Sequence, residues 1–279
     1  MGRHRWRRGG GTGGGMKAAS SGGIAIRYRE DGRPDAPAMV FANSLGTDLQ
    51  VWDAVAAVFA GRFRVLRYDK RGHGLSDAPA GPYSLDDHVG DLAAVMDAAG
   101  ARDAVVVGVS VGGMIAQALS AARPDLVRAL VLSNTAHRIG PPDMWERRID
   151  AVRAAGIAPL ADAILERWFS LAFRAAGDLA VAPWRNMLVR TPAEGYAGTC
   201  AAIRDADLTA VAAAIAVPTL AVAGAHDAAT PPDLVRSTAD LIPGAAFVSL
   251  PGLGHLPCVE DPGAVARVVD AFLKERHLG

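Results

Sequence analysis

The sequence of 279 residues has few cysteines, no long apolar segment and no excess charge of either sign. Its two cysteines, Cys200 and Cys258, cannot build a framework of disulfide bonds. Neither has a second Cys or His at the spacing of a metal site. We therefore expect a protein of the reducing cytoplasm whose fold depends on neither disulfides nor a structural metal.

A run without charged residues extends from Leu208 to Ala225, but it does not have the character of a membrane span. Pro218 divides it into an alanine-rich helical half and a strand-like half. We interpret it as the end of a helix followed by a buried strand, so the sequence predicts no crossing of a membrane.

The basic and acidic residues are equal in number, 29 each, but unevenly distributed. A glycine-rich leader, residues 1–15, carries four arginines and no acid, which leaves 25 basic against 29 acidic residues in the rest. This mildly acidic body would repel a phosphate backbone and has no basic stripe, so we expect it to bind neither nucleic acid nor a membrane surface. The leader lacks the apolar segment of a secretory signal, and we interpret it as a disordered extension before Met16.

Short apolar runs alternate with longer amphipathic patterns along the chain. Several of the short runs are too continuously apolar to leave one face in water, which is typical of strands in a parallel sheet. The expected strands are 24–28, 38–42, 63–68, 104–108, 129–133, 219–224 and 246–250, and the expected helices are 49–59, 85–99, 111–122, 232–241 and 262–276. The alternation predicts an α/β fold with a doubly wound, mostly parallel sheet.

This alternation stops between Asn134 and Ala216. The interval holds three of the five tryptophans in helical patterns interrupted by prolines. We predict an inserted helical cap at residues 137–215, between a first part of the core at 16–136 and a second part at 216–279.

Ser110 lies in the segment GVSVGG, directly after an apolar strand pattern and directly before an apolar helix pattern. A serine in G-x-S-x-G at such a junction is typical of a nucleophile elbow, where small neighbours allow a sharp turn. The N-terminus of the helix would direct its amides toward the reacting group. We therefore predict that Ser110 is a nucleophile and that the Val111 N–H is an oxyanion donor.

A serine nucleophile needs a base and an acid that orients the base. Of the seven histidines, His137, His226 and His255 remain as candidates by position, and His255 is favoured because it follows the last strand and precedes the last helix. Asp227 directly follows the strand 219–224. The order Ser110, Asp227, His255 is that of the α/β-hydrolase triads. A second oxyanion donor should come from the loop after strand 38–42, and we assign the Leu45 N–H.

Beyond these residues the chain resembles the 3-oxoadipate enol-lactonase family of the α/β-hydrolase superfamily, from about residue 24 to residue 272. The motifs that carry the resemblance are residues 41–47 (FANSLGT), 64–74 (RVLRYDKRGHG), 81–85 (GPYSL), 113–114 (GM), 133–136 (SNTA), 139–140 with Trp145, 167–169 (RWF), 195–196 (GY) and 202–207 (AIRDAD). Lys70 in the D-x-R-G-H-G turn, His137 and Pro257-Cys258 depart from the family pattern. We expect the turn itself to organise the structure beneath the site.

The resemblance implies hydrolysis of an anionic five-membered enol-lactone in the β-ketoadipate route of aromatic catabolism. The triad would form an acyl-enzyme on Ser110 and then hydrolyse it with water, with no metal and no organic cofactor. The substrate carboxylate would need a cation, for which Arg138 is the first candidate and Arg204 the second. Trp145 is expected to form an apolar wall of the pocket or to pack within the cap.

Two alternatives remain open from the sequence. A related esterase, lactonase or carbon–carbon bond hydrolase would use the same triad on another acyl compound. A ligand receptor without catalytic activity would keep the pocket of the fold, although the complete set of Ser110, Asp227 and His255 argues against it.

Overall fold

The computed structural model describes residues 16–279, so the expected leader lies outside the described residues. Eight strands form one sheet in the order β1-β2-β4-β3-β5-β6-β7-β8. The strands are β1 (Lys17–Ser21), β2 (Ile24–Gly32), β3 (Ala38–Ala42), β4 (Arg64–Tyr68), β5 (Ala104–Val109), β6 (Val127–Ser133), β7 (Thr219–Gly224) and β8 (Ala246–Leu250). Strands β1 and β2 are antiparallel to their neighbours, and the pairs from β4 to β8 are parallel. The prediction of a mostly parallel α/β sheet is thus confirmed.

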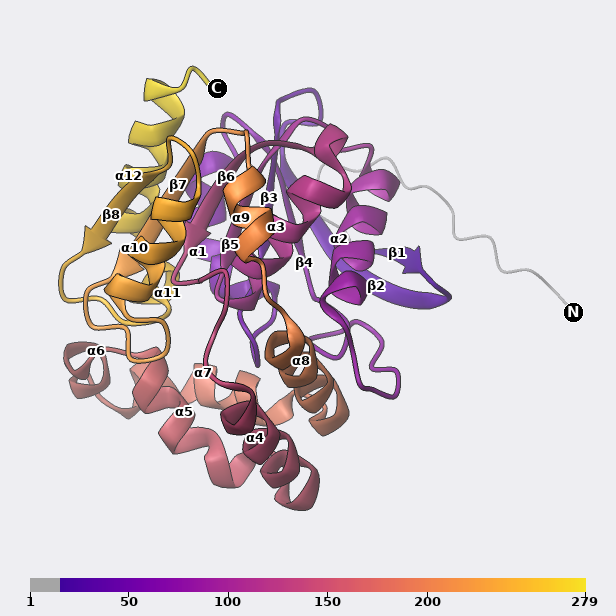
Figure 1. Ribbon diagram of the computed structural model, residues 1–279, viewed down its shortest axis with the longest axis vertical. Coiled ribbons are helices and arrows are strands. Elements are labelled where there is room, and N and C mark those ends of the chain that lie inside the picture. Colours follow the sequence, from indigo (N-terminus) through magenta and orange to yellow (C-terminus); the bar gives the residue numbers. More distant parts are fainter. Residues whose placement is uncertain (1–15) are drawn as a thin grey trace, which may run out of the picture.

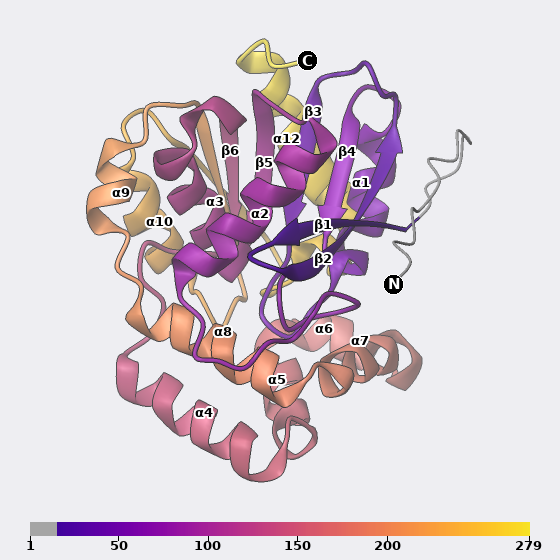
Figure 2. The same ribbon diagram turned by 90° about the vertical axis from the view of Figure 1, so that its right-hand side faces the viewer.

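Helices cover both faces of this sheet (Figures 1 and 2). On one face α1 (Asp53–Phe59) packs against α12 (Pro262–Glu275), beside the short α11 (Pro257–Glu260). On the other face lie α2 (Leu85–Ala99), α3 (Val111–Ala122), α9 (Thr209–Ala214) and α10 (Pro232–Leu241). Short 3₁₀ turns occupy Leu49–Trp52, Pro124–Leu126 and Ala158–Leu160. The central strands β3, β5 and β7 are therefore buried along their whole length, as their apolar sequences require.

The ends of α2 illustrate how local sequence defines these elements. Ser84 and Asp87 form a reciprocal capping box at its first turn, and Gly100 ends it in the left-handed conformation. The edge strand β1, in contrast, was absent from the sequence prediction because its segment KAASS has neither a continuous apolar run nor a regular alternation of large apolar side chains. It forms a hairpin with β2 through Gly22 and Gly23, both at positive φ.

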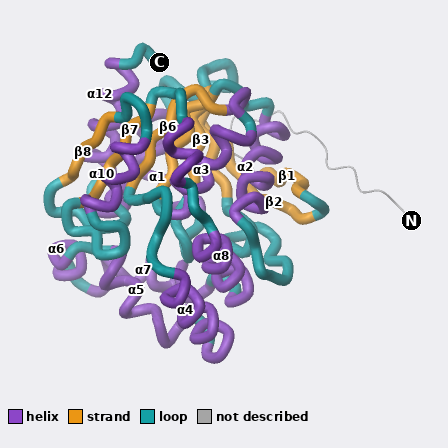
Figure 3. The backbone as a smooth tube through the Cα atoms, viewed as in Figure 1, coloured by secondary structure: helices purple, strands orange, loops and turns teal. Residues whose placement is uncertain are grey.

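Five helices between β6 and β7 form a separate layer at the carboxyl ends of the parallel strands (Figures 1 and 3). They are α4 (Pro142–Ala155), α5 (Ala161–Trp168), α6 (Leu171–Ala175), α7 (Asp178–Arg190) and α8 (Ala193–Asp205). We refer to α4–α8 as the cap helices. None of the helices in residues 16–279 combines the length and the apolar character needed to cross a lipid bilayer. Residues that follow β3, β5, β7 and β8 line one cavity together with residues of the cap helices, at the edge where a ligand site is expected in an α/β sheet.

Candidate active site

Ser110 occupies a strained turn between β5 and α3. Its φ of 58° and ψ of −124° are unusual for a residue with a side chain. The turn is possible because α3 begins very close to the sheet: a Cβ at Gly112 would lie 2.2 Å from the carbonyl oxygen of Ala42. A Cβ at Gly113 would lie 2.4 Å from the Thr135 side chain. The two glycines therefore allow the close approach, and the strand-turn-helix context expected for a nucleophile elbow is present.

Asp227 and His255 lie in contact, although 28 residues separate them in the sequence. Asp227 lies in the turn after β7, and His255 lies on the loop after β8. The distance between His255 Nδ1 and Asp227 Oδ2 is 2.8 Å, and both side chains are almost completely buried. An imidazole held in this way keeps its proton on Nδ1 and directs Nε2 as a base toward the cavity.

The Asp227 carboxylate accepts further hydrogen bonds that hold it in place. Oδ2 accepts from Asn134 Nδ2 at 2.8 Å and from Thr230 Oγ1 at 2.6 Å, and Oδ1 accepts from the Ala229 and Thr230 N–H groups. Burial raises the pKa of Asp227, but the His255 charge and the hydrogen bonds from His255, Thr230 and Asn134 outweigh it, so the net pKa is lowered. The carboxylate thus stays ionised beside the imidazole.

Sequence reasoning did not identify Asn134 or Thr230 as parts of this network. Asn134 has a φ of 48°, and its amide bridges Asp227 and the Gly254 carbonyl. Two signals in the sequence pointed to Asn134: its position directly after β6 and its place in the SNTA motif of residues 133–136. Such backbone strain in a buried polar residue is typical of functional sites.

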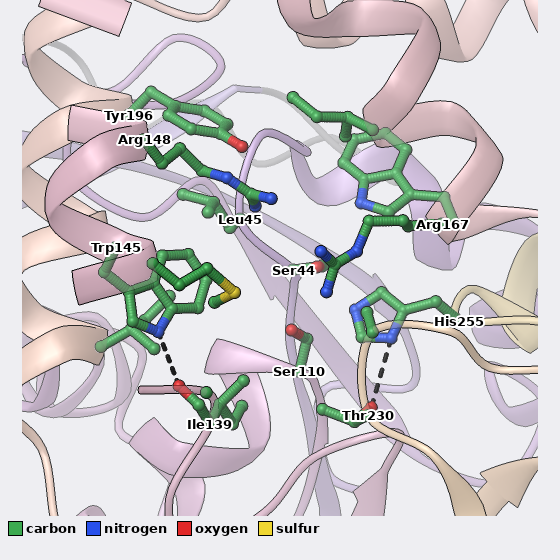
Figure 4. Close-up of a pocket in the computed structure, with 16 residues that line it drawn as sticks. Ser44, Leu45, Ser110, Ile139, Trp145, Arg148, Arg167, Tyr196, Thr230 and His255 are labelled. Carbon is green, nitrogen blue, oxygen red and sulfur yellow. Dashed lines mark hydrogen bonds between the residues drawn. The ribbon is translucent and has the colours of Figure 1, made fainter. Parts of the chain in front are cut away.

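Ser110 and His255 share one cavity beneath the cap helices (Figure 4). We call this cavity the Ser110 pocket. It is lined by core loops and by α4, α5 and α8, and it contains no carboxylate. Its lining residues are Ser44, Leu45, Ser110, Ile139, Gly140, Met144, Trp145, Arg148, Ile164, Arg167, Trp168, Tyr196, Ile203, Ala229, Thr230 and His255.

Two backbone N–H groups beside Ser110 have no acceptor among residues 16–279. They belong to Leu45, in the loop after β3, and to Val111, the first residue of α3. Both residues are buried, with relative exposures of 6% and 0%. Buried N–H groups are almost always paired in folded proteins, so an unpaired couple next to a serine is the arrangement expected of an oxyanion hole.

The positive charge of the Ser110 pocket comes from Arg148 of α4 and Arg167 of α5, which both extend into it (Figure 4). Neither arginine forms an ion pair within residues 16–279. The Arg148 guanidinium lies 5.2 Å from the centre of the Trp145 ring. Burial lowers the pKa of Arg167, and so does the charge of Arg148, whereas Asp227 and Tyr196 raise it. Two unpaired guanidinium groups in one cavity are suited to an anionic ligand.

Arg138 and Arg204, the two expected ligands of the substrate carboxylate, are not among the residues that line the Ser110 pocket. Arg138 is 56% exposed at its side chain and pairs with Asp207 at 3.5 Å. Arg204 is 25% exposed at its side chain and binds the Asp205 carboxylate through Nε at 2.7 Å. Both arginines form ion pairs with aspartates outside the Ser110 pocket, so neither offers an unpaired charge to a ligand in that pocket.

Trp145 does line the Ser110 pocket, and its Nε1 donates to the Ile139 carbonyl at 2.6 Å. Helical spacing offered a signal for Arg148, because it follows Trp145 by three residues and so lies on the same face of α4.

Within residues 16–279 no group of three or more His, Cys, Asp or Glu side chains is arranged to hold a metal ion.

Comparisons with known proteins show the family to which the chain belongs. The family model described as the alpha/beta hydrolase fold matches residues 37–262. A curated relative, 3-oxoadipate enol-lactonase 2 of Acinetobacter baylyi, is 33% identical over 259 residues, which cover 90% of this chain and 94% of the relative. The crystal structure of the enol-lactonase from Burkholderia xenovorans LB400 superposes with a TM-score of 0.90 and 40% identity, covering 92% of this chain and all of that chain. A thermophilic esterase from Thermogutta terrifontis has a TM-score of 0.87 at 26% identity, covering 94% of this chain and 98% of the esterase.

Proposed function

Because the chain belongs to the α/β-hydrolase fold family, and is an enzyme that hydrolyses ester or lactone bonds, we propose that its substrate is 3-oxoadipate enol-lactone. The observation that carries this proposal is the pair of unpaired arginines in the Ser110 pocket. The enol-lactone has one acetate carboxylate next to its ring. Arg148 and Arg167 supply the charge that would compensate this carboxylate once it is removed from water.

The proposed reaction begins when Ser110 Oγ attacks the lactone carbonyl and His255 Nε2 takes the hydroxyl proton. Asp227 stabilises the resulting imidazolium, and the Leu45 and Val111 N–H groups donate to the oxyanion. Collapse of the tetrahedral intermediate breaks the ring C–O bond. The enolate oxygen takes the proton from His255, and the enol then tautomerises to a ketone.

Ring opening leaves the whole substrate attached to Ser110 as an acyl-enzyme, because the leaving group and the acyl group belong to one molecule. His255 then takes a proton from a water molecule, which attacks the ester in the same oxyanion hole. Release returns Ser110 as a free hydroxyl and gives 3-oxoadipate. His255 carries the protons of acylation and deacylation, the enol can tautomerise with solvent water, and the scheme uses no metal or organic cofactor.

The proposal extends to the setting of the reaction, which is the β-ketoadipate route of aromatic catabolism in the cytoplasm. Both cysteines, Cys200 and Cys258, are free thiols, and burial raises the pKa of each to about 12. Thiols of this kind are little ionised and therefore unreactive at neutral pH. Their chemistry fits a reducing compartment.

The test is to form the enol-lactone in situ, add the purified protein and follow the decay of its absorbance. Decay well above the uncatalysed rate is expected. A panel of neutral p-nitrophenyl esters serves as the comparison, because the arginine pair predicts a preference for the anionic lactone. Fast turnover of the neutral esters with no acceleration of lactone decay would instead identify an esterase of another pathway.

A further inference from the structure

Lys70 is a fully buried lysine directly beneath the loop that carries the Leu45 N–H. It lies just after β4, and its relative exposure is 0%. Its Nζ donates to the carbonyl oxygen of Ser44 at 2.5 Å and to that of Thr47 at 3.2 Å. Within residues 16–279 it forms no ion pair with a carboxylate. The hydrogen bonds of this ammonium group are therefore directed at the backbone of one loop, residues 44–47.

The Ser44 carbonyl and the Leu45 N–H are the two ends of a single peptide group. A cationic donor on the carbonyl oxygen draws electron density from the amide and makes its N–H a stronger donor. It also fixes the plane of the peptide, and hence the direction of the N–H. Lys70 thus acts on the Leu45 donor without touching the substrate.

His73 holds the next amide of the same loop. Its Nε2 accepts from the Gly46 N–H at 3.0 Å, and its Nδ1 lies 3.0 Å from the Arg71 carbonyl oxygen. The ring therefore carries its proton on Nδ1 and is neutral, because Nε2 must accept. Burial lowers the pKa of His73, and the neighbouring Lys70 charge lowers it further. The Gly46 N–H is engaged in this way, whereas the Leu45 N–H has no acceptor within residues 16–279, and Leu45 lines the Ser110 pocket.

Burial and the neighbouring carboxylates have opposite effects on the pKa of Lys70. Burial lowers the pKa of Lys70 and the Asp69 and Asp48 carboxylates raise it, with a net pKa of about 7. A buried lysine that had only a packing role would be replaced at lower cost by an apolar side chain of similar volume. Both carbonyl partners of Lys70 lie in the loop of the expected oxyanion hole, so its contacts indicate a role in that loop beyond packing.

We propose that Lys70 is a positioning residue for the oxyanion hole, which orients and polarises the Ser44–Leu45 peptide so that the Leu45 N–H stabilises the tetrahedral intermediate. The inference rests on the proposed roles of Ser110 and Leu45, but it does not depend on which lactone is the natural substrate. It assigns a function to the side chain at which this sequence departs from the family pattern in the D-x-R-G-H-G turn.

The test compares Lys70→Met with wild type in steady-state hydrolysis of p-nitrophenyl acetate and in inhibition by a small alkylboronic acid. The boronate forms a tetrahedral adduct on the serine, with one oxygen at the oxyanion position. Removal of one complete oxyanion donor costs about 10²- to 10³-fold in kcat. Weakening one should lower kcat about 10- to 100-fold, with KM within twofold, and should raise the inhibition constant of the boronate by a similar factor.

Tyr68→Phe is the matched control, because Tyr68 ends β4 two residues before Lys70 and the substitution removes a buried hydroxyl without a partner within residues 16–279. It should leave kcat and boronate binding unchanged. If Lys70→Met does not fold, Lys70→Gln is measured in the same way, since it retains an N–H donor without the charge and should lose less than the methionine variant. An unchanged kcat, or a loss confined to KM with normal boronate affinity, overturns the proposal. Because both assays use a simple ester, they stand apart from the question of whether the enol-lactone is the substrate.

Discussion

The arginine pair of the Ser110 pocket allows a prediction about affinity that also concerns stability. Replacing Arg148 or Arg167 by Met keeps most of the side-chain volume and removes one guanidinium group. A hydrogen bond to a charged group contributes about 1.5–3 kcal/mol, and each 1.4 kcal/mol corresponds to a factor of ten. We expect kcat/KM for the enol-lactone to fall about 10- to 100-fold in each single variant, mainly through KM.

The same substitution should not destabilise the free protein. In the absence of substrate the two guanidinium groups are partly buried and have no carboxylate partner in the described chain, and the Arg148 charge lowers the pKa of Arg167. Removal of one charge relieves this repulsion. We therefore expect the melting temperature of Arg148→Met to equal or exceed that of wild type, an example of stability given up for function.

Arg147→Met is the control on the same helix. Arg147 is 71% exposed at its side chain and pairs with Asp143 one turn earlier. Its loss should change neither kinetics nor stability measurably, because exposed ion pairs of this kind contribute little. A neutral ester provides the second control, and its kcat/KM should change less than threefold in Arg148→Met. Equal losses on the neutral and the anionic substrate, or no loss on either, would refute the role of the arginine pair.

Other consequences of the site can be tested by single substitutions. Asp227→Asn should lower kcat about 10⁴-fold at neutral pH because the amide cannot hold the His255 imidazole in the required tautomer; activity within tenfold of wild type contradicts this. The pKa of Asp227 is lowered from 3.8 on folding, so its contribution to the free energy of unfolding is present above about pH 4 and lost as the pH falls through the folded pKa. Denaturant unfolding at several pH values should show that the difference in free energy of unfolding between wild type and Asp227→Asn becomes smaller in acid. A difference that does not change with pH argues against the lowered pKa. Gly112→Ala would place a Cβ 2.2 Å from the Ala42 carbonyl oxygen. The substitution should therefore lower the free energy of unfolding by about 1–3 kcal/mol and lower the melting temperature. An unchanged melting temperature would contradict the close packing of this turn.

The sheet and the approximate position of the candidate site followed from local sequence patterns. Apolar runs such as β5 and β7 can satisfy their composition only inside a covered parallel sheet, and the carboxyl ends of such strands meet at one edge. Ser110, Asp227 and His255 follow β5, β7 and β8, which are parallel strands of this sheet, so topology brings their loops to the same edge. The edge strand β1 was missed because its small polar residues carry no periodic signal.

The arginines of the Ser110 pocket could not be predicted from their positions in the sequence. Arg138 stands close to a strand end and Arg148 lies on an amphipathic helix of the cap, so position favoured Arg138, whereas Arg148 is the residue that lines the Ser110 pocket. The side of α4 that faces the sheet depends on how the cap packs over the strands, which the helical pattern does not specify. Surface carboxylates then neutralise Arg138 and Arg204, and only the three-dimensional structure reveals these partners.

The central claim is that Ser110 is the nucleophile that opens an anionic enol-lactone. It is tested most directly by the rate of enol-lactone decay with wild type and with Ser110→Ala at equal concentration, after equal melting temperatures have shown that both are folded. The account predicts rapid decay with wild type and a loss of at least about 10³-fold in the alanine variant. A Ser110→Ala protein that retains most of the wild-type rate would contradict it.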